Sequence, residues 1–376
     1  MTDIYTDSYS SRTGATMVTS PIVELSARSL SRIWASRYLP NLSCFVSEQS
    51  ESSVAHLLEY SSDFGRQKTA DRTRRHLRIC CELAGLEVNQ LFSGSSNLVN
   101  LAKVRRLAKS VEAVYEKVLQ FYEQQSKIKQ NVADSLNPIS GWIPEIEALS
   151  IELQPILYQM QQEHLADEDP RTLGFVTTQF HFSTQMILKR LSPIEKALLG
   201  SYFQLAEEQV CIPWQEVCEL AKRYDRASYE VLLIEHLLPE SDAIAHTVCE
   251  RARQQFPQFR SRRGSWDNLQ ITASMMRDLN MFQGYLWLCV LQQDLTPITV
   301  RLLPLCLMVF PSVNVSWEFI EQTIRLLVEE IRSRLTLHQW SIVQPYAMGL
   351  IDIFAVQQQK SGRPAIVQVV PIVIDR

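Results

Sequence analysis

Two short arginine clusters contain the residues of this chain whose types and spacing best suit the binding of anions. A guanidinium group holds a phosphate or a carboxylate through paired hydrogen bonds, and an indole ring can stack on a base. One cluster falls within residues 72–78, and the other is followed by a tryptophan. Their members are Arg72, Arg74, Arg75, Arg78, Arg260, Arg262, Arg263 and Trp266. The clusters predict a surface for an acidic protein partner or for another anion.

The same clusters, at 72–78 and 260–263, leave a nucleic-acid-binding regulator open as an alternative function. Such a protein would bind with a steep salt dependence and would bind more weakly when Arg260, Arg262 and Arg263 become alanine. Domains of this kind usually carry a broad basic stripe, with an isoelectric point above about 9. The net charge of this chain is −4, so nucleic-acid binding is possible but not favoured.

The spacing of the glycines excludes the commonest nucleotide-binding and hydrolase motifs. The chain has 11 glycines, and the closest two are Gly85 and Gly94. A phosphate-binding loop needs clustered glycines, because backbone amides must approach the ligand closely. Neither the dinucleotide fingerprint nor the P-loop nor the G-x-S-x-G nucleophile elbow occurs. An enzyme is therefore the less favoured interpretation.

Histidine and acidic residues do not form a recognisable set of metal ligands. His164 precedes Asp167, Glu168 and Asp169, and His181 follows. The three acidic residues lead into a proline and are typical of a solvated loop, and neither H-E-x-x-H nor Glu-x-x-His occurs. We therefore expect no metal and no cofactor.

Cysteine usage and hydropathy indicate a cytoplasmic protein without a transmembrane segment. The eight cysteines are scattered without a C-x-x-C pair, which is typical of reduced thiols packed as small apolar residues. The first 20 residues are polar and lack the apolar core of a signal peptide. The most apolar stretch, residues 281–311, is interrupted by Gln292, Asp294 and Arg301, whereas a spanning helix needs about 20 predominantly apolar residues.

A long amphipathic hairpin is the clearest predicted element. Apolar residues recur at steps of three and four over residues 104–132, and a shorter series of the same kind covers residues 146–160. Residues 137–141 contain proline and glycine and break the chain between the two series. We expect the two helices to fold back as an antiparallel hairpin near residues 95–166.

Helix-start signals recur in the C-terminal half of the chain. Ser192 and Glu195 form a predicted capping box around a proline, which is favoured in the first helical turn. Further helix starts are predicted at Thr296, Ser316 and Thr336, the last with a glutamine three residues later. Repeated caps, low glycine content and helical periodicity together predict an all-α fold.

The chain divides into four predicted regions. They are a flexible Ser/Thr-rich tail (1–50), a helical region with the antiparallel hairpin (51–170), a helical bundle domain (171–358) and a strand-like tail (359–376). Part of the first tail, near residues 22–39, could dock on the rest of the protein. The β-branched run at 365–374 could dock on the core or on the sheet edge of a partner.

Charge is partitioned along the chain. Residues 131–250 carry 7 basic and 19 acidic residues, whereas residues 51–130 and 251–376 each carry 13 basic and 9 acidic residues. The basic flanks could lie against the acidic middle within one molecule, or the acidic segment could attract a charged partner. A solvated acidic face is the third interpretation.

Two C-terminal stretches suggest sites, and each has a structural alternative. Residues 213–238 have the spacing of a helix-turn-helix, but their second helix is apolar and acidic and is better explained as a buried bundle helix. Residues 275–287 are rich in methionine and aromatic side chains and contain Arg277 and Asp278. They are more typical of core, but an enzyme with an apolar pocket there is a further alternative. With the adjoining loop at 260–263, this helix is the best candidate for a functional surface.

Several short runs in the C-terminal half carry a family resemblance. The runs cover residues 211–218, 261–264, 277–283, 286–290 and 303–311. They resemble a group of uncharacterised helical cytoplasmic proteins of cyanobacteria over about residues 190–355. The resemblance implies a helical protein and brings no activity, cofactor or site residue with it.

The leading hypothesis for function is a non-enzymatic adaptor or regulatory protein that acts on a protein partner through helical surfaces. It depends on the absence of the catalytic motifs above, on the amphipathic hairpin and on the partitioned charge. A pull-down at low and at moderate salt should then retain a specific partner.

Overall fold

The computed structural model describes residues 30–38, 51–92, 101–124, 142–165, 172–225 and 227–361. Within these ranges the protein is all-α, as predicted, apart from one short β-hairpin. The elements after the short helix at 30–36 are α3 (Glu51–Ser61), α4 (Asp63–Leu91), α5 (Leu101–Gln124), α6 (Trp142–Leu165), α7 (Thr172–Leu188), α8 (Pro193–Cys211), α9 (Trp214–Ala221), α10 (Tyr229–Leu237), η3 (Leu238–Glu240), α11 (Ser241–Gln255), β1 (Arg260–Ser261), β2 (Gly264–Ser265), α12 (Leu269–Gln292), η4 (Pro297–Leu302), α13 (Leu303–Ser312), α14 (Trp317–Ser333) and α15 (Leu337–Ser361).

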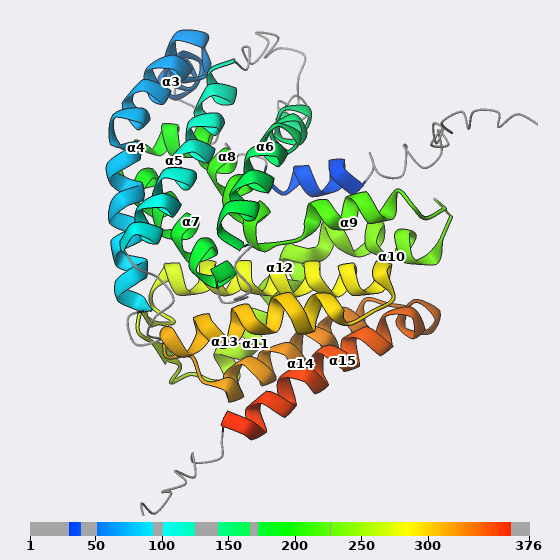
Figure 1. Cartoon of the computed structure of the whole chain (residues 1–376). Helices are drawn as coiled ribbons and strands as arrows, with labels where there is room; N and C mark the ends of the chain where they lie inside the picture. The colour runs from blue at the N-terminus through cyan, green and yellow to red at the C-terminus, as the bar shows by residue number, and fades with distance from the viewer. Residues whose placement is uncertain are drawn as a thin grey trace, which may run out of the picture.

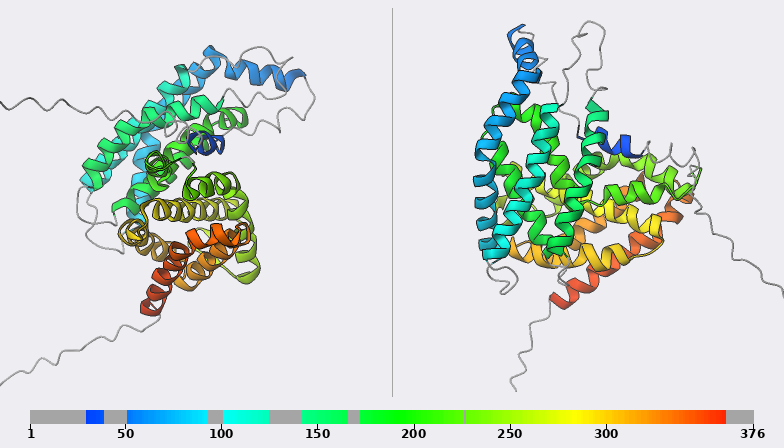
Figure 2. Two further views of the ribbon diagram at one scale, coloured as in Figure 1. Left: turned by 90° about the vertical axis from the view of Figure 1, so that its right-hand side faces the viewer. Right: turned by 45° about the horizontal axis from the view of Figure 1, so that its top comes forward.

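Helices α4 to α8 form the first group. Figures 1 and 2 show α4, α5 and α6 side by side, and both α5 and α6 also contact α8. The contact between α5 and α6 agrees with the predicted hairpin, because the inner face of α5 buries the apolar series from Val104 to Phe121. The last predicted members of that series, Ile128 and Val132, lie outside the described residues.

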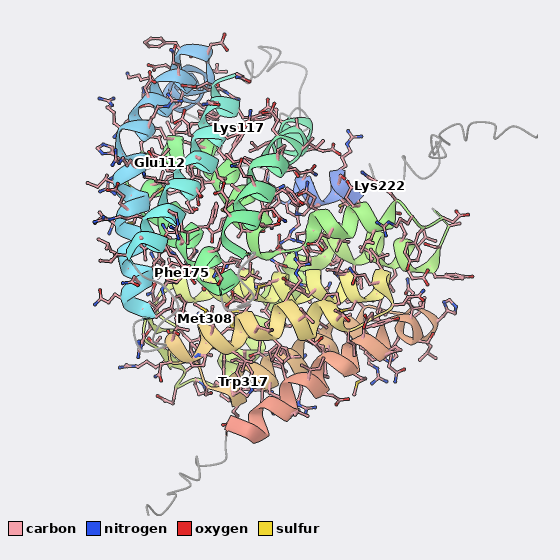
Figure 3. All side chains as sticks on the ribbon, viewed as in Figure 1. Glu112, Lys117, Phe175, Lys222, Met308 and Trp317 are labelled. Atoms are coloured by element: carbon pink, nitrogen blue, oxygen red, sulfur yellow. The ribbon has the colours of Figure 1, made fainter. Side chains whose placement is uncertain are left out.

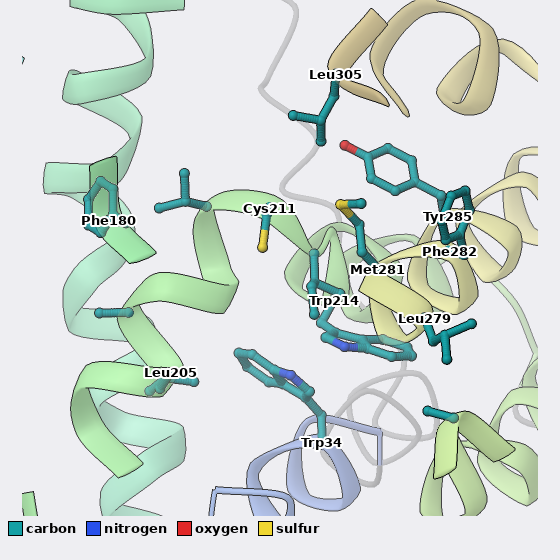
Figure 4. Packing of buried hydrophobic residues seen from close by; sticks show 14 of the residues in the cluster. Trp34, Phe180, Leu205, Cys211, Trp214, Leu279, Met281, Phe282, Tyr285 and Leu305 are labelled. Atoms are coloured by element: carbon teal, nitrogen blue, oxygen red, sulfur yellow. The ribbon is translucent and has the colours of Figure 1, made fainter. Parts of the chain in front are cut away.

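Helices α9 to α15 form the second group, with α12 at its centre. Every residue of α12 from Leu279 to Leu291 is buried, and the helix contacts α9, α10, α11 and α15. The methionine and aromatic side chains of this helix are therefore core for the most part, as the sequence predicts. Figure 4 shows Phe282 and Tyr285 of α12 in this core, with Trp214 of α9 nearby.

The two groups meet where α7 crosses α13. Gly174 of α7 has no side chain, and Val309, Leu305 and Met308 of α13 fill the space that a Cβ atom would occupy. Phe175, the next residue, lies close to Met308 in the same region (Figure 3). A small residue here allows the two helices to approach closely.

Helical segments begin at all four predicted positions, and three of the four have a side-chain cap. Ser192 and Glu195 form a complete capping box, Thr336 does the same with its glutamine, and Ser316 caps α14. A helical segment also begins after Thr296, with proline in its first turn, but the hydroxyl of Thr296 donates to the carboxylate of Asp294 and does not cap η4.

The segment at 30–38 docks on the helical body. Trp34 and Tyr38 are buried, and the hydroxyl of Tyr38 donates to the carboxylate of Glu208 at 2.7 Å. Figure 4 shows Trp34 beside Trp214. The rest of the predicted N-terminal tail and the strand-like run at 365–374 lie outside the described residues.

Two further expectations concern helices. The stretch with helix-turn-helix spacing forms α9 and α10, and α10 buries Val231, Leu233, Ile234 and Leu237, as expected for a bundle helix.

Among the described helices, each is too short or too polar to cross a membrane.

Candidate functional site

Arg74 of the first cluster joins α4 to α5. Its Nε atom donates to Glu116 at 3.0 Å, and its two terminal nitrogens donate to Glu123 at 3.1 Å. Hydrogen bonds to Glu123 and Glu116 raise the pKa of Arg74 above its usual value. Arg74 was predicted to belong to a binding surface, but its guanidinium group is already occupied by carboxylates of its own chain.

The other three arginines of this cluster differ in whether their guanidinium groups are already paired with a carboxylate. Arg72 contacts Glu195 at 3.2 Å, and Arg78 contacts Glu82 at 2.9 Å. Arg75 is exposed, and it donates to the backbone oxygen of Asp71 at 3.4 Å. Arg75 is therefore the member of this cluster best placed to meet a partner.

The second cluster lies on the β1–β2 hairpin. The two strands pair in antiparallel register, and Gly264 has a φ of 130°, a conformation that L side chains rarely adopt. Arg260 and Arg262 point to solvent, and the backbone nitrogen of Arg262 donates to Val313 at 2.8 Å. These two guanidinium groups remain available for an anion.

Trp266 and Arg263 lie in less exposed places than a surface site requires. Trp266 is 7% exposed, donates from its indole to the backbone of Phe256 at 2.8 Å and packs beside Phe259. Arg263 is half-buried, with its guanidinium 5.0 Å from the ring centre of Phe182. Arg260 and Arg262 therefore lie on the solvent side of the hairpin, whereas Arg263 and Trp266 lie on its inner side.

The inner side of the hairpin borders an apolar cavity of about 140 Å³. Its lining comes from α7, α8, the hairpin, α12, α13 and α14, and most of it is methionine, aromatic and aliphatic. Figure 4 shows Cys211, Met281 and Leu305, which come from three of these helices and line the cavity. A space of this size is several times the volume that one water molecule needs.

A chain of hydrogen bonds runs along the polar edge of the cavity. Arg263 donates to the side-chain oxygen of Gln185 at 3.1 Å, so the amide nitrogen of Gln185 faces His181 Nε2 at 2.8 Å. His181 Nδ1 lies 2.7 Å from the carboxylate of Glu207 and 2.5 Å from Nη1 of Arg277, so both groups meet at this ring nitrogen. Arg277 also donates to Glu207, at 2.8 Å.

This arrangement fixes the charges of the edge. Burial alone would raise the pKa of Glu207, but His181 and Arg277 outweigh it and lower the pKa to about 2. Burial and the nearby Arg277 lower the pKa of His181. Burial raises the pKa of Asp278, which Arg277 partly opposes. The edge thus combines an ionised glutamate, a neutral imidazole and a guanidinium held between two acidic groups.

These protonation states favour binding by shape and polarity over proton transfer. A carboxylate with a pKa of about 2 is a weak general base, and a catalytic base works best with a pKa near the working pH. Burial raises the pKa of the two thiols in the lining, Cys211 and Cys306, which makes them weak nucleophiles. Within the described residues, no group of histidine, cysteine and acidic side chains is arranged to hold a metal.

The sequence analysis identified one of the three helices that build this edge. Arg277 and Asp278 stand out because they interrupt a methionine-rich helix, and they were placed correctly near the hairpin loop. His181 and Glu207 were missed as partners, since they come from α7 and α8, which are distant in sequence from α12. The sequence signal for Glu207 is a pair of glutamates on a helix that is otherwise largely apolar and buried.

The fold and the site define a helical bundle protein with an apolar cavity that has a polar edge. Residues 194–352 match the profile of a family described as "Phycobilisome protein". The match runs from α8 into α15 and covers less than half of the 376 residues. No curated protein and no solved structure matches the chain.

The family match agrees with the resemblance seen in the short sequence runs. Its boundaries lie within the expected residues 190–355, and it supports a helical segment of cyanobacterial type there. The expectation that this group is uncharacterised is wrong, because the family carries a description. The cavity edge at Glu207 and Arg277 lies inside the matched segment, whereas α4 lies outside it.

Proposed function

We propose that this protein is a non-enzymatic helical adaptor or regulatory protein that acts in the cytoplasm through contacts with other proteins. The observation that supports this most strongly is the similarity of residues 194–352 to phycobilisome proteins. A phycobilisome is a light-harvesting assembly, so a chain with such a segment is expected to work in contact with other proteins.

The helices before the matched segment give the adaptor a second surface. Helix α7 contacts both α8 and α13, so α3 to α7 are packed against the phycobilisome-type segment. Exposed guanidinium groups lie on both parts, with Arg75 on α4 and Arg260 and Arg262 on the hairpin. Such cations suit an acidic partner, because complementary charge directs association.

Affinity capture of the tagged full-length chain from its native cytosol tests this proposal. A protein partner that is retained after nuclease treatment and at moderate salt is the expected result. A variant with Arg75, Arg260 and Arg262 changed to alanine is the matched comparison, and it should retain less of that partner. Capture of no specific protein would overturn the adaptor function.

The same experiment separates the nucleic-acid alternative. Recovery of nuclease-sensitive material alone would favour it, and binding would then fall steeply with salt. The positions of the arginines argue against it, since Arg74 and Arg78 are bound to carboxylates of their own chain. A phosphate would have to compete with these ion pairs.

The cavity supports a second candidate function, the binding of a small apolar molecule with an acidic group. Its apolar lining would hold the body of the ligand, and Arg263 would face the acidic group. Arg263 donates to Gln185, which is a neutral side chain. The positive charge of Arg263 could therefore form an ion pair with an anionic group of the ligand. An enzyme built on this cavity is less favoured because of the protonation states described above.

Titration calorimetry with benzoate, a small aromatic anion, tests the second candidate, because a cavity of this volume holds a molecule of about the size of benzene. Cys306 is buried in the cavity lining, so Cys306→Phe should fill the space and abolish benzoate binding. Cys306→Ala keeps the space open and should bind benzoate as the wild type does. Equal binding by Cys306→Phe, or no binding by the wild type, would remove this candidate.

A further inference from the structure

The outer face of α4 is exposed along most of the helix. Its members recur at steps of three and four residues, which is the spacing of one helical face. They are Phe64, Lys68, Arg72, Arg75, Ile79, Leu83 and Leu86, and we call them the α4 stripe. Helix α4 forms an outer edge of the molecule in the views of Figures 1 and 2. The stripe is therefore accessible to another molecule.

The aliphatic residues of the stripe do not take part in the packing of α4 on its neighbouring helices. Ile79, Leu83 and Leu86 are 50%, 42% and 53% exposed, whereas Leu77 and Val88 on the inner face are buried. The inner face is the one that packs on α5 and α7. A single exposed leucine is ordinary on a protein surface, but three on successive turns form an apolar contact patch.

The charges beside this patch are segregated along the helix. Arg72, Arg75 and His76 lie on the N-terminal side of Ile79, where Asp71 is paired with Arg74 of the same helix. Glu82 and Glu87 lie on the C-terminal side, where Glu82 is paired with Arg78 of the same helix at 2.9 Å. The basic half therefore keeps a net positive charge, and Glu87 is the acidic group left for a partner. If two such helices run antiparallel, the basic half of each lies against the acidic half of the other. A parallel pair would place like charges together. The stripe is therefore complementary to itself in one orientation only.

We propose that the α4 stripe binds a second copy of this chain in an antiparallel, two-fold symmetric pair. Ile79 of each copy faces the partner's Leu83. This register places Arg75 opposite the partner's Glu87, with His76 one residue further along the same face. The pair buries the aliphatic patches of both copies at its centre and sets opposite charges at its flanks.

The size of the stripe indicates how strong the association should be. The stripe is about 33 Å long at 1.5 Å per residue, and a pair of single helices of that length buries less than the ~1,600 Å² of a standard interface. We therefore expect a dissociation constant in the micromolar range or weaker. This inference does not depend on the family match, because α4 lies outside the matched segment at 194–352. It shares Arg75 with the surface proposed for a protein partner, and sedimentation of the purified chain tests self-association without that partner.

Sedimentation velocity of the full-length chain from about 5 to 300 μM tests the association, since this range brackets a weak dimer. The wild type should pass from monomer to dimer, and Leu83→Glu should stay monomeric. Leu232→Glu is the matched control, because Leu232 is 46% exposed on α10 and should leave the dimer intact. A monomeric wild type, or a dimer that survives Leu83→Glu, overturns the proposal. Thermal unfolding of both variants should match the wild type.

A charge exchange tests which residues meet. Arg75→Glu should weaken the dimer about three- to tenfold, as expected for loss of an exposed ion pair and gain of a repulsive one. The double variant Arg75→Glu with Glu87→Arg restores opposite charges across the pair and should recover the wild-type constant within about twofold. No weakening in the first, or no recovery in the second, contradicts the antiparallel register.

Single introduced cysteines test the orientation directly. In the antiparallel pair, the two copies of residue 82 lie near the symmetry axis, whereas the two copies of residue 68 lie roughly 40 Å apart. Glu82→Cys should therefore form a disulfide-linked dimer under mild oxidation, and Lys68→Cys should not. The wild type is the background control, and its cysteines in the described ranges are buried. A linked dimer from Lys68→Cys would show a parallel pair and refute the proposal.

Discussion

Glu207 and Glu208 show how two adjacent buried glutamates acquire opposite properties. Glu207 forms hydrogen bonds with His181 and Arg277, which lower its pKa to about 2 in spite of burial. For Glu208, burial is the dominant cause and raises the pKa, although it accepts hydrogen bonds from Tyr38 and a neighbouring glutamine. Adjacent residues point to different sides of a helix, so Glu207 meets Arg277 whereas Glu208 meets Tyr38.

The first prediction concerns the pH dependence of these two residues. An ordinary glutamate has a pKa near 4.5, so ionised Glu207 contributes stability above that pH and loses it as the pH falls towards 2. Glu207→Gln should cost roughly 3 kcal/mol at neutral pH, and the difference from the wild type should close between about pH 4.5 and 2. Urea unfolding of both proteins across this range measures the difference.

Glu208→Gln is the matched control on the same helix. Because the pKa of Glu208 is raised, its protonated form is the one that the folded protein favours. Stability from this group therefore increases as the pH falls through the folded pKa, which is the opposite sign to Glu207. Parallel pH profiles for the two variants would show that the assignment of the ionised carboxylate is incorrect.

Arg66 is a buried arginine that binds backbone as well as side chains. Its Nε atom donates to Ser61 at 3.2 Å, and its Nη1 atom donates to the backbone of Tyr122 at 3.4 Å. The guanidinium also lies 5.0 Å from the ring centre of Tyr122 and 3.9 Å from Glu145. It thereby connects the start of α4 to α5 and α6.

The second prediction is that Arg66→Met destabilises the protein by about 2–4 kcal/mol, because it leaves buried carbonyl groups without their donor and Glu145 without its neighbouring cation. The unfolding free energy of Arg66→Lys should lie between those of the wild type and Arg66→Met, since an ammonium group cannot reproduce the planar set of donors of a guanidinium group. Arg75→Met on the exposed face should change the unfolding free energy by less than about 0.5 kcal/mol. Chemical unfolding at micromolar concentration measures all three, and equal effects of Arg66→Met and Arg75→Met would contradict the assignment.

At the scale of the element, the helix starts were predictable because each depends on residues three positions apart. Ser192 accepts from the backbone nitrogen of Glu195 at 3.4 Å, and the Glu195 carboxylate accepts from the backbone of Ser192 at 2.8 Å. The same carboxylate also contacts Arg72 of α4. The box was visible in the sequence, but its contact with α4 depends on the tertiary fold.

The third prediction separates capping from helix propensity within α8. Ser192→Ala removes the cap and should cost about 1 kcal/mol. Gly200→Ala should stabilise the protein by about 0.5–1 kcal/mol, because an added Cβ at residue 200 meets nothing within 4 Å and the unfolded chain loses freedom. Denaturant midpoints of the two variants should move in opposite directions. A shift of both in the same direction would refute this account of α8.

The cavity was less predictable than the helices around it. Periodicity assigns Met281 and Phe282 to a buried face, which is correct, but a periodic pattern does not say whether the facing helices fill the space completely. The polar edge requires His181, Glu207 and Arg277 to meet from three helices, and only tertiary packing brings them together. Sequence reasoning can propose one member of such a network when a charge interrupts an apolar run.

At the scale of the whole molecule, the partitioned charge is explained by ion pairs within the chain. Basic residues of the two flanks contact acidic residues of the 131–250 segment at many places among the described residues. These pairs are Arg66 with Glu145, Arg72 with Glu195, Lys117 with Glu152, Arg277 with Glu207, Arg301 with Glu216 and Arg334 with Glu240. The first of the three sequence interpretations, basic flanks against an acidic middle, is therefore confirmed for these residues.

These pairs differ in their energetic weight. Exposed pairs usually contribute less than about 1 kcal/mol, whereas buried pairs such as Arg277 with Glu207 couple strongly to the surrounding packing. Arg301 and Glu216 lie between these limits. They form two hydrogen bonds, of 2.7 and 2.8 Å, and their side chains are 38% and 48% exposed. This pair joins η4 to α9 and is suited to a direct measurement.

The fourth prediction is a coupling energy between Arg301 and Glu216. A double-mutant cycle with Arg301→Gln and Glu216→Gln should give about 0.5–1 kcal/mol at low salt, because the bidentate geometry favours the pair. The coupling should shrink by about half near 1 M salt, where the Debye length is about 3 Å. The cycle also removes the separate contribution of Arg301 to the ring of Tyr285, 5.4 Å away, because that contact is lost with and without Glu216.

Lys222 and Glu219 provide the control cycle, because they form an exposed pair within one turn of the same α9 region. Their coupling should be about 0.3 kcal/mol or less, since a local pair on a helix surface gains little from folding. A larger coupling in the local pair than in the long-range pair would mean that the charge partition is not a source of tertiary stability. A salt-independent coupling between Arg301 and Glu216 would mean that packing, and not charge, joins η4 to α9.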